Sequence, residues 1–376
     1  MRLDAFSRER RNNFDVLRLG AASIVLVSHS FVVGGHHEPH IGHFPLGTLG
    51  VEIFFAISGF LVAKSWFAEP RVRAFAVKRG LRIMPALIVC VLALAFLLGP
   101  AVTSHSPGSY FGARDTYAYP VDSIVAVPTG GTVRDIGLHL PGVFEGHATS
   151  SVDLSLWTLP IEVQAYIALA VLGALGLLSG MLPLVAAGFL ALSLAPASVA
   201  DAPGIGSLLH FVRGDDGEAA HLLAIFFVSA LMFRHRSRIA LHGGVAALAA
   251  IAAVATLGTA IERPVLVLAL PYLALFLAYR SWGGLRRLTA RGDVSYGLYL
   301  LAFPVQQMII YAWGDPGLSP AVVALIAFPI TYALAFGSWH LVEKHALRLK
   351  GRLATPRAKR VPAPAEPEPA PAVLQA

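Results

Sequence analysis

Apolar runs of about twenty residues, separated by short polar segments, recur along most of the chain. A run of about 18 or more apolar residues is long enough to cross the hydrocarbon layer of a bilayer as an α-helix. The pattern predicts an all-α membrane protein, a polytopic bundle of about ten transmembrane helices. The expected spans are 14–33, 49–67, 84–102, 157–178, 181–199, 219–233, 242–260, 263–280, 293–312 and 319–341. Because the connector 201–218 is polar and the sixth run is short, nine or eleven spans also fit the pattern.

Basic residues lie almost entirely in every second connector. With the N-terminus inside, 25 of the 29 lysines and arginines fall in the predicted cytoplasmic segments 1–18, 64–82, 234–238, 280–291 and 344–360. The other four are Arg114, Arg134, Arg213 and Arg263. Lysine and arginine accumulate in the cytoplasmic connectors of bacterial membrane proteins. The distribution therefore predicts an even number of spans, both termini in the cytoplasm, and a multi-pass location in a bacterial inner membrane.

Composition agrees with this class of protein and excludes others. The chain is 56% hydrophobic and 14% charged, whereas a soluble domain carries about 25% charged residues. Its net charge of +7 does not indicate nucleic-acid binding, because that function requires a basic face on a soluble domain. The single cysteine, Cys90, permits no intramolecular disulfide and no Cys/His zinc motif.

Three regions make up the predicted organisation. A polar cytoplasmic segment covers 1–13, and no A-x-A cleavage site follows it, so we expect the first span to be retained. The transmembrane domain covers 14–345 and includes an outer connector at about 103–153 that is too long for a plain turn. Such a connector either lines a site or forms a packing lid. The tail 346–376 is basic and then Pro/Ala-rich, which predicts cytoplasmic disorder.

Two ionisable residues, Arg18 and His29, lie eleven residues apart in the first span. Eleven residues are three helical turns, so both side chains point to one face, about 16 Å apart along the axis. Ionisable residues inside a span are costly and are functional candidates by default, although Arg18 can also snorkel to the cytoplasmic surface. A neutral imidazole accepts a proton near neutral pH, which makes His29 the candidate general base. The structural alternative is a core histidine satisfied by Ser28 and Ser30.

Two paired motifs lie at the cytoplasmic side and in the second span. Arg79 and Arg82 are three residues apart and hence neighbours on one helix face, a geometry that suits phosphate groups. The positive-inside rule explains the same two residues without any ligand. Ser58 and Gly59 interrupt the second span, where small residues favour close helix packing. Glu52, near the outer end of that span, is interpreted as interfacial.

A carboxylate opens the fourth span. Glu162 lies in its first turn, after Thr158 and Pro160, where a negative charge favours the positive end of the helix. Tyr166 follows one turn later on the same face. We therefore expect Glu162 either to cap the helix or, at the outer mouth, to orient a sugar hydroxyl or a catalytic histidine.

A histidine cluster occupies the first outer loop, at His36, His37, His40 and His43 with Glu38. These are metal-ligand residue types. Pro39 breaks helical spacing and no HExxH pattern is present, so we predict a solvated loop and no metal site.

Six sequence blocks, taken in order, resemble the bacterial acyltransferase-3 family of membrane-bound acyltransferases. They are NNFDVLRLGAASIVLVSHSF, GVEIFFAISGFLVAKSW, KRGLRIMPAL, SLWTLPIEVQAY, DVSYGLYLLAFPVQQ and WHLVEK, and they extend over about 12–350. The resemblance implies a ten-helix domain that uses an acyl-CoA, often acetyl-CoA, to acylate extracytoplasmic carbohydrate such as O-antigen, exopolysaccharide or Nod factor. It implies no permanently bound cofactor.

The same resemblance implies roles for individual residues. Arg18 and His29 look like the family's Arg-x10-His pair, and Arg79 and Arg82 look like its Arg-x-x-Arg motif, implicated in handling acyl-CoA. Ser58 matches a Ser-Gly-Phe block and is expected beside the donor, and Glu162 matches a Trp-containing block as a catalytic candidate.

The chain departs from the family pattern at two positions. Many members have histidine where this chain has Ala302, and proline where it has His345. The first departure leaves a second catalytic histidine without a counterpart here.

These residues suggest a mechanism that connects the two membrane faces. Arg79 and Arg82 hold the phosphates of acyl-CoA, the pantetheine arm inserts between helices, and Arg18 steers the donor or polarises a carbonyl oxygen. His29 acts as general base on a sugar hydroxyl or, less simply, carries the acyl group itself. Polar residues within spans also suit a transporter or flippase of a lipid-linked glycan, or a membrane scaffold in a polysaccharide-assembly complex.

Overall fold

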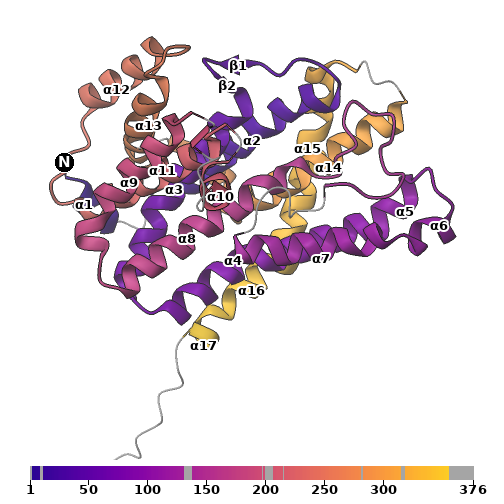
Figure 1. Ribbon diagram of the computed structural model, residues 1–376, viewed down its shortest axis with the longest axis horizontal. Coiled ribbons are helices and arrows are strands. Elements are labelled where there is room, and N and C mark those ends of the chain that lie inside the picture. The colour runs from indigo at the N-terminus through magenta and orange to yellow at the C-terminus, as the bar shows by residue number, and fades with distance from the viewer. Residues whose placement is uncertain are drawn as a thin grey trace, which may run out of the picture.

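The computed structural model describes residues 2–8, 12–130, 138–196, 198–199, 206–214, 216–280, 283–314 and 318–354. These residues form a bundle of helices with one short hairpin (Figure 1). The longer helices of the first half are α2 (Phe14–Val33), α3 (Leu46–Ala68), α4 (Val72–Ala93), α7 (Arg114–Thr129), α8 (Thr158–Ala174) and α9 (Leu178–Leu194). Those of the second half are α11 (Glu218–Arg234), α12 (Gly243–Ala255), α13 (Glu262–Tyr279), α14 (Ser295–Trp313) and α15 (Pro320–Ser338).

Short elements join these helices. The short helices are α1 (Leu3–Arg8), α5 (Gly99–Val102), α6 (Pro107–Gly112), α10 (Gly206–Arg213), α16 (Lys344–Arg348) and α17 (Lys350–Ala354). The 3₁₀ and π segments are η1 (Leu94–Leu98), η3 (Leu154–Trp157), η5 (Gly283–Leu288) and η6 (Trp339–Glu343). Strands β1 (His40–Ile41) and β2 (Phe44–Pro45) pair antiparallel in the loop between α2 and α3.

Each predicted span coincides with a helix, namely α2, α3, α4, α8, α9, α11, α12, α13, α14 and α15. Among the described residues, six helical segments are long and apolar enough to cross a membrane: 14–33, 46–68, 72–102, 154–174, 262–279 and 320–348. An α-helix forms its backbone hydrogen bonds within itself and needs no partners from the hydrocarbon, which offers none. The chain is therefore a multi-pass membrane protein.

Helix α3 packs between α2 and α11, and glycines allow this close approach. A Cβ at Gly59 would lie 2.1 Å from the backbone oxygen of Phe226 in α11, and one at Gly50 would lie 2.5 Å from that of Ala21 in α2. The predicted packing role of Gly59 is confirmed. Gly47 lies opposite Ser28 and Gly50 lies opposite Ala21, so α3 runs antiparallel to α2. Continuing this register places the middle of α3 beside the first turns of α2.

The long connector 103–153, predicted to lie outside the cytoplasm, is more structured than a lid of irregular loop. Its helix α7 lies along α4 and contacts α8 (Figure 1). The phenol of Tyr110, in α6, is buried and donates to the backbone oxygen of Ala95 at 2.7 Å. The connector is thus anchored to the side of the bundle.

The start of the predicted disordered tail is helical instead. Residues 344–354 form α16 and α17, and α17 packs on α4. The sequence did not predict this helix, because a run of basic residues is equally typical of a cytoplasmic tail. The Pro/Ala-rich part from 355 onwards lies outside the described residues.

Candidate active site

A cavity of about 270 Å³ lies among α2, α3, α4, α8, α14 and α17. Its walls include five of the six predicted site residues, namely Arg18, Ser58, Arg79, Arg82 and Glu162. They come from four helices, α2, α3, α4 and α8. The structure therefore gathers most of the predicted residues around one space, and His29 is the exception.

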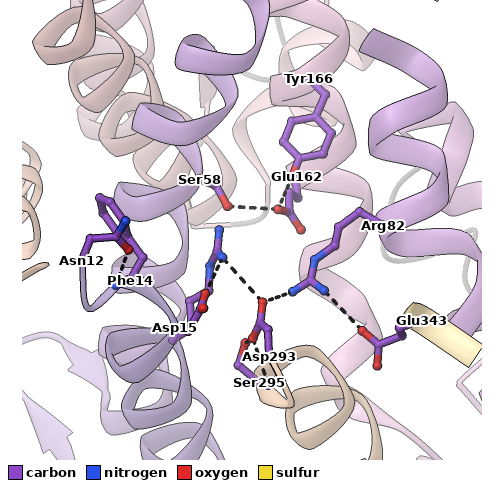
Figure 2. Close-up of polar contacts among 11 residues, drawn as sticks. Asn12, Phe14, Asp15, Ser58, Arg82, Glu162, Tyr166, Asp293, Ser295 and Glu343 are labelled. Carbon is purple, nitrogen blue, oxygen red and sulfur yellow. Dashed lines mark hydrogen bonds and ion pairs between the residues drawn. The ribbon is translucent and has the colours of Figure 1, made fainter. Parts of the chain in front are cut away.

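Glu162 forms the acidic wall of this cavity. Its Oε1 accepts a hydrogen bond from Ser58 Oγ at 3.1 Å and another from the phenol of Tyr166 (Figure 2). Glu162 shares its cavity with Arg18, and His29 is not among the lining residues. The first turn of α8 faces α3 at this level, so the carboxylate contacts Ser58 rather than the end of its own helix.

Two of the arginines are held in an ion-pair network. Arg82 lies between Asp293 and Glu343, with N–O distances of 2.6 Å and 3.3 Å (Figure 2). Arg18 is 3.6 Å from both Asp15 and Asp293. The sequence reasoning missed Asp293 and Glu343. The available signal was their position. Both carboxylates lie at the ends of apolar spans, and arginines lie at the ends of other spans.

Arg79 differs from Arg82, three residues away on the same wall. Its guanidinium carbon lies 5.9 Å from the ring centre of Phe75 and 5.7 Å from that of Tyr166. Its Nε is buried and has no hydrogen-bond partner among the described residues. Aromatic faces fix an arginine without neutralising its charge. Arg79 therefore presents an unneutralised cation to the cavity, as an anion site requires.

His29 does not line the cavity. It is 7% exposed, its ring lies edge-on to Phe303 at 5.1 Å, and its Nδ1 has no partner among the described residues. The neighbouring serines bond elsewhere: Ser28 donates to Glu38, and Ser30 donates to the backbone oxygen of Leu26. The alternative of a core histidine satisfied by these two serines is thus wrong.

One lining residue nevertheless lies a helical turn from a residue that contacts His29. Tyr299 lines the cavity, and Phe303, which contacts His29, lies one turn later on α14. On the same helix the buried Gln306 donates to Ser30 at 2.7 Å, and its Oε1 has no partner in the described part of the chain. The buried His29 Nδ1 and Gln306 Oε1 thus both lack partners in the described part of the chain. This makes the region around them suitable for a polar substrate group.

A buried carboxylate–histidine pair lies elsewhere in the bundle. Glu52 and His221 are 2.7 Å apart, with side-chain exposures of 2% and 0%. The interpretation of Glu52 as interfacial is wrong, because α3 turns this carboxylate towards α11. Neither residue lines the cavity, and the pair links α3 to α11 on the face opposite α2.

The outer-loop histidines have separate partners. His36 contacts the backbone oxygen of Leu318 at 3.3 Å, His40 contacts that of Glu38 at 2.8 Å, and His43 lies 2.7 Å from Glu262. Within the described ranges, no group of three or more histidine, cysteine or carboxylate residues could hold a metal ion.

A second cavity, of about 390 Å³, adjoins the first between α4, α7 and α8. Its lining is apolar except at Arg79 and Tyr166, which belong to both cavities together with Ile83. Arg79 thus stands at the junction of a polar and an apolar compartment.

Comparisons with known proteins agree with the sequence blocks. Residues 11–340 match a family model described as an acyltransferase domain. A protein of Shigella phage Sf6 named O-acetyl transferase is 32% identical over 344 residues, which cover 90% of this chain and 96% of the relative. Nodulation protein 10 of Rhizobium leguminosarum bv. viciae is 35% identical over 173 residues, 44% of this chain and 45% of the relative. No solved structure matches the chain.

Proposed function

Because this chain belongs to the acyltransferase-3 family and is an O-acetyltransferase, we propose that it transfers an acetyl group from acetyl-CoA to a hydroxyl of an extracytoplasmic carbohydrate, such as O-antigen or an exopolysaccharide. The observation that carries the proposal is the cavity itself. It joins cations suited to phosphates with a carboxylate and hydroxyls suited to a polar arm, and its lining residue Tyr299 lies one helical turn from His29's neighbour Phe303.

The donor lies, in this proposal, with its phosphates at the cationic end of the cavity. Arg79 supplies a charge that no carboxylate among the described residues neutralises. Arg82 and Arg18 are already paired with Asp293 and form part of this end of the cavity. They therefore contribute only part of their positive charge to binding the donor. The pantetheine arm extends past Ser58 and Glu162, whose oxygens accept hydrogen bonds from its amide groups.

The acetyl transfer itself is a single displacement. The acceptor hydroxyl oxygen forms a bond to the thioester carbonyl carbon, its proton passes to the imidazole of His29, and the carbon–sulfur bond breaks. The thiolate takes this proton from the His29 imidazolium and leaves as CoA, so atoms and charges balance and the imidazole is neutral again. The unpaired Nδ1 of His29 is the proton acceptor available at this end. Glu162 holds the donor arm from the opposite wall.

The topology forms part of the proposal: ten spans, both termini in the cytoplasm, and insertion in a bacterial inner membrane. The positions of ten helices and the one-sided distribution of basic residues support it.

Cysteine labelling tests this topology. Because Cys90 is buried, a maleimide should label only a cysteine introduced elsewhere. Ser109→Cys should react with a membrane-impermeant maleimide on intact cells, and Ser237→Cys only after permeabilisation. Labelling of both from outside would contradict the topology.

The function is tested by the ester content of surface polysaccharide, measured by NMR in a strain lacking the gene and in the same strain complemented with it. We expect one O-acetyl signal to disappear on deletion and to return on complementation. Purified protein with isotope-labelled acetyl-CoA and the deacetylated polysaccharide should restore the same signal. An unchanged ester profile with altered polymer export would instead favour the glycan transporter.

A further inference from the structure

A fourth cation faces the cavity from the C-terminal end of the described chain. Lys350 opens α17 and lines the cavity together with Arg18, Arg79 and Arg82. Helix α17 packs against α4, which carries the two later arginines (Figure 1). Lys350 lies ten residues beyond the last position that the family model matches. Its place in the cavity comes from the packing of α17 on α4.

The charge balance around this cluster is incomplete. Arg82 and Arg18 share Asp293, Arg82 also contacts Glu343, and Lys78 pairs with Glu69. In the described part of the chain, neither Arg79 nor Lys350 has a carboxylate within ion-pair distance. Glu162 is the carboxylate that lines the cavity, and it is bonded to Ser58 and Tyr166.

Cations held this close together repel one another unless an anion lies among them. Burial, followed by the charges of Arg79, Arg82 and Lys78, lowers the pKa of Lys350 from its ordinary value to about 8. A lysine with no ligand to bind would ordinarily extend into water, since its long stem permits this. Lys350 is instead partly buried and lines the same cavity as Arg79.

We propose that Lys350 and Arg79 together bind a phosphate of the nucleotide end of the donor, so that α17 closes the cationic end of the cavity over the bound donor. The proposal rests on the proposed function for the identity of the donor. Arginine held by two aromatic rings gives a fixed, directional contact, and lysine adds a mobile point charge that adapts to the phosphate. The C-terminal helices then act in donor binding and not only as a cytoplasmic extension.

Direct binding of CoA to the full-length protein, by calorimetry in nanodiscs without acceptor, tests this inference. Lys350→Ala should weaken CoA binding by about 10- to 100-fold, the usual loss for a hydrogen bond to a charged group. Lys350→Arg should retain most of the affinity. Lys344→Ala, a lysine of α16 that does not line the cavity, is the matched control and should bind as wild type.

A second measurement separates a phosphate contact from general damage to the fold. For acetyl-CoA, Lys350→Ala should raise KM with little change in kcat. For acetyl-pantetheine, which has no nucleotide end, the variant and the wild type should have equal kcat/KM. Equal losses with both donors, or unchanged CoA binding in Lys350→Ala, would overturn the inference. Wild-type protein that binds CoA through Lys350 but transfers no acetyl group would overturn the proposed function and leave the anion site standing.

Discussion

Replacing His29 by glutamine is expected to reduce acetyl transfer by about 10²- to 10⁴-fold, the usual contribution of a general base. Glutamine is similar in size and stays polar, but it does not accept a proton near neutral pH. Since His29 lies outside the cavity lining, CoA affinity should stay within about twofold of wild type. The measurement is kcat with labelled acetyl-CoA, together with CoA binding on the same preparation.

The control for this substitution is His105→Gln, an exposed histidine of the outer connector. It should keep full activity. Full activity of His29→Gln at normal protein level would remove the histidine from the mechanism. Glu162 would then be the next candidate base, because it is the carboxylate within the cavity and its Oε1 already accepts from the Ser58 hydroxyl.

Replacing Asp293 by asparagine should destabilise the protein by about 1–3 kcal/mol, because Arg82 and Arg18 lose the carboxylate they share and keep only Glu343 and Asp15 as carboxylate partners among the described residues. Asp293 is 12% exposed and contacts both Arg82 and Arg18, which are about one-fifth exposed. Asparagine keeps the size and a hydrogen bond but removes the negative charge that both guanidinium groups share. The melting temperature in detergent, followed by tryptophan fluorescence, should fall accordingly.

Ligand binding gives the same variant a distinctive second property. With Asp293 neutralised, an added polyanion can pair with the released arginines, so pyrophosphate or CoA should raise the melting temperature of Asp293→Asn more than that of wild type. Asp122→Asn, an exposed carboxylate of α7, should match wild type in both measurements. A stable Asp293→Asn variant with unchanged ligand response would show that the network carries little energy.

The arrangement of the cavity is compatible with the two substrates of the proposed reaction. Arg18 and His29 lie on one helix, three turns apart, and only the first lines the cavity. The donor and acceptor ends of the proposed reaction thus lie at different levels of α2, with the ring of Phe303 against His29. The apolar second cavity meets the first at Arg79.

The sequence alone determined the helical class, the helix positions and the family, for a local reason. A membrane-spanning helix satisfies its backbone within itself, so an apolar run of sufficient length predicts it without knowledge of its neighbours. The spacing of Arg79 and Arg82 is also local, because residues three apart share a helix face. The predictions of membrane class and acyltransferase family are accordingly confirmed.

Only the tertiary structure decided which residues share a site. Arg82 pairs with Asp293 at a separation of 211 residues and with Glu343 at 261. Glu52 joins His221, Lys350 joins the cavity, and His29 stands apart from it. Helices in a bilayer are apolar on their lipid-facing and protein-facing sides alike, so the hydrophobic pattern does not reveal which face meets which neighbour. Those pairings are set by close packing and by the few buried charges that must find a partner.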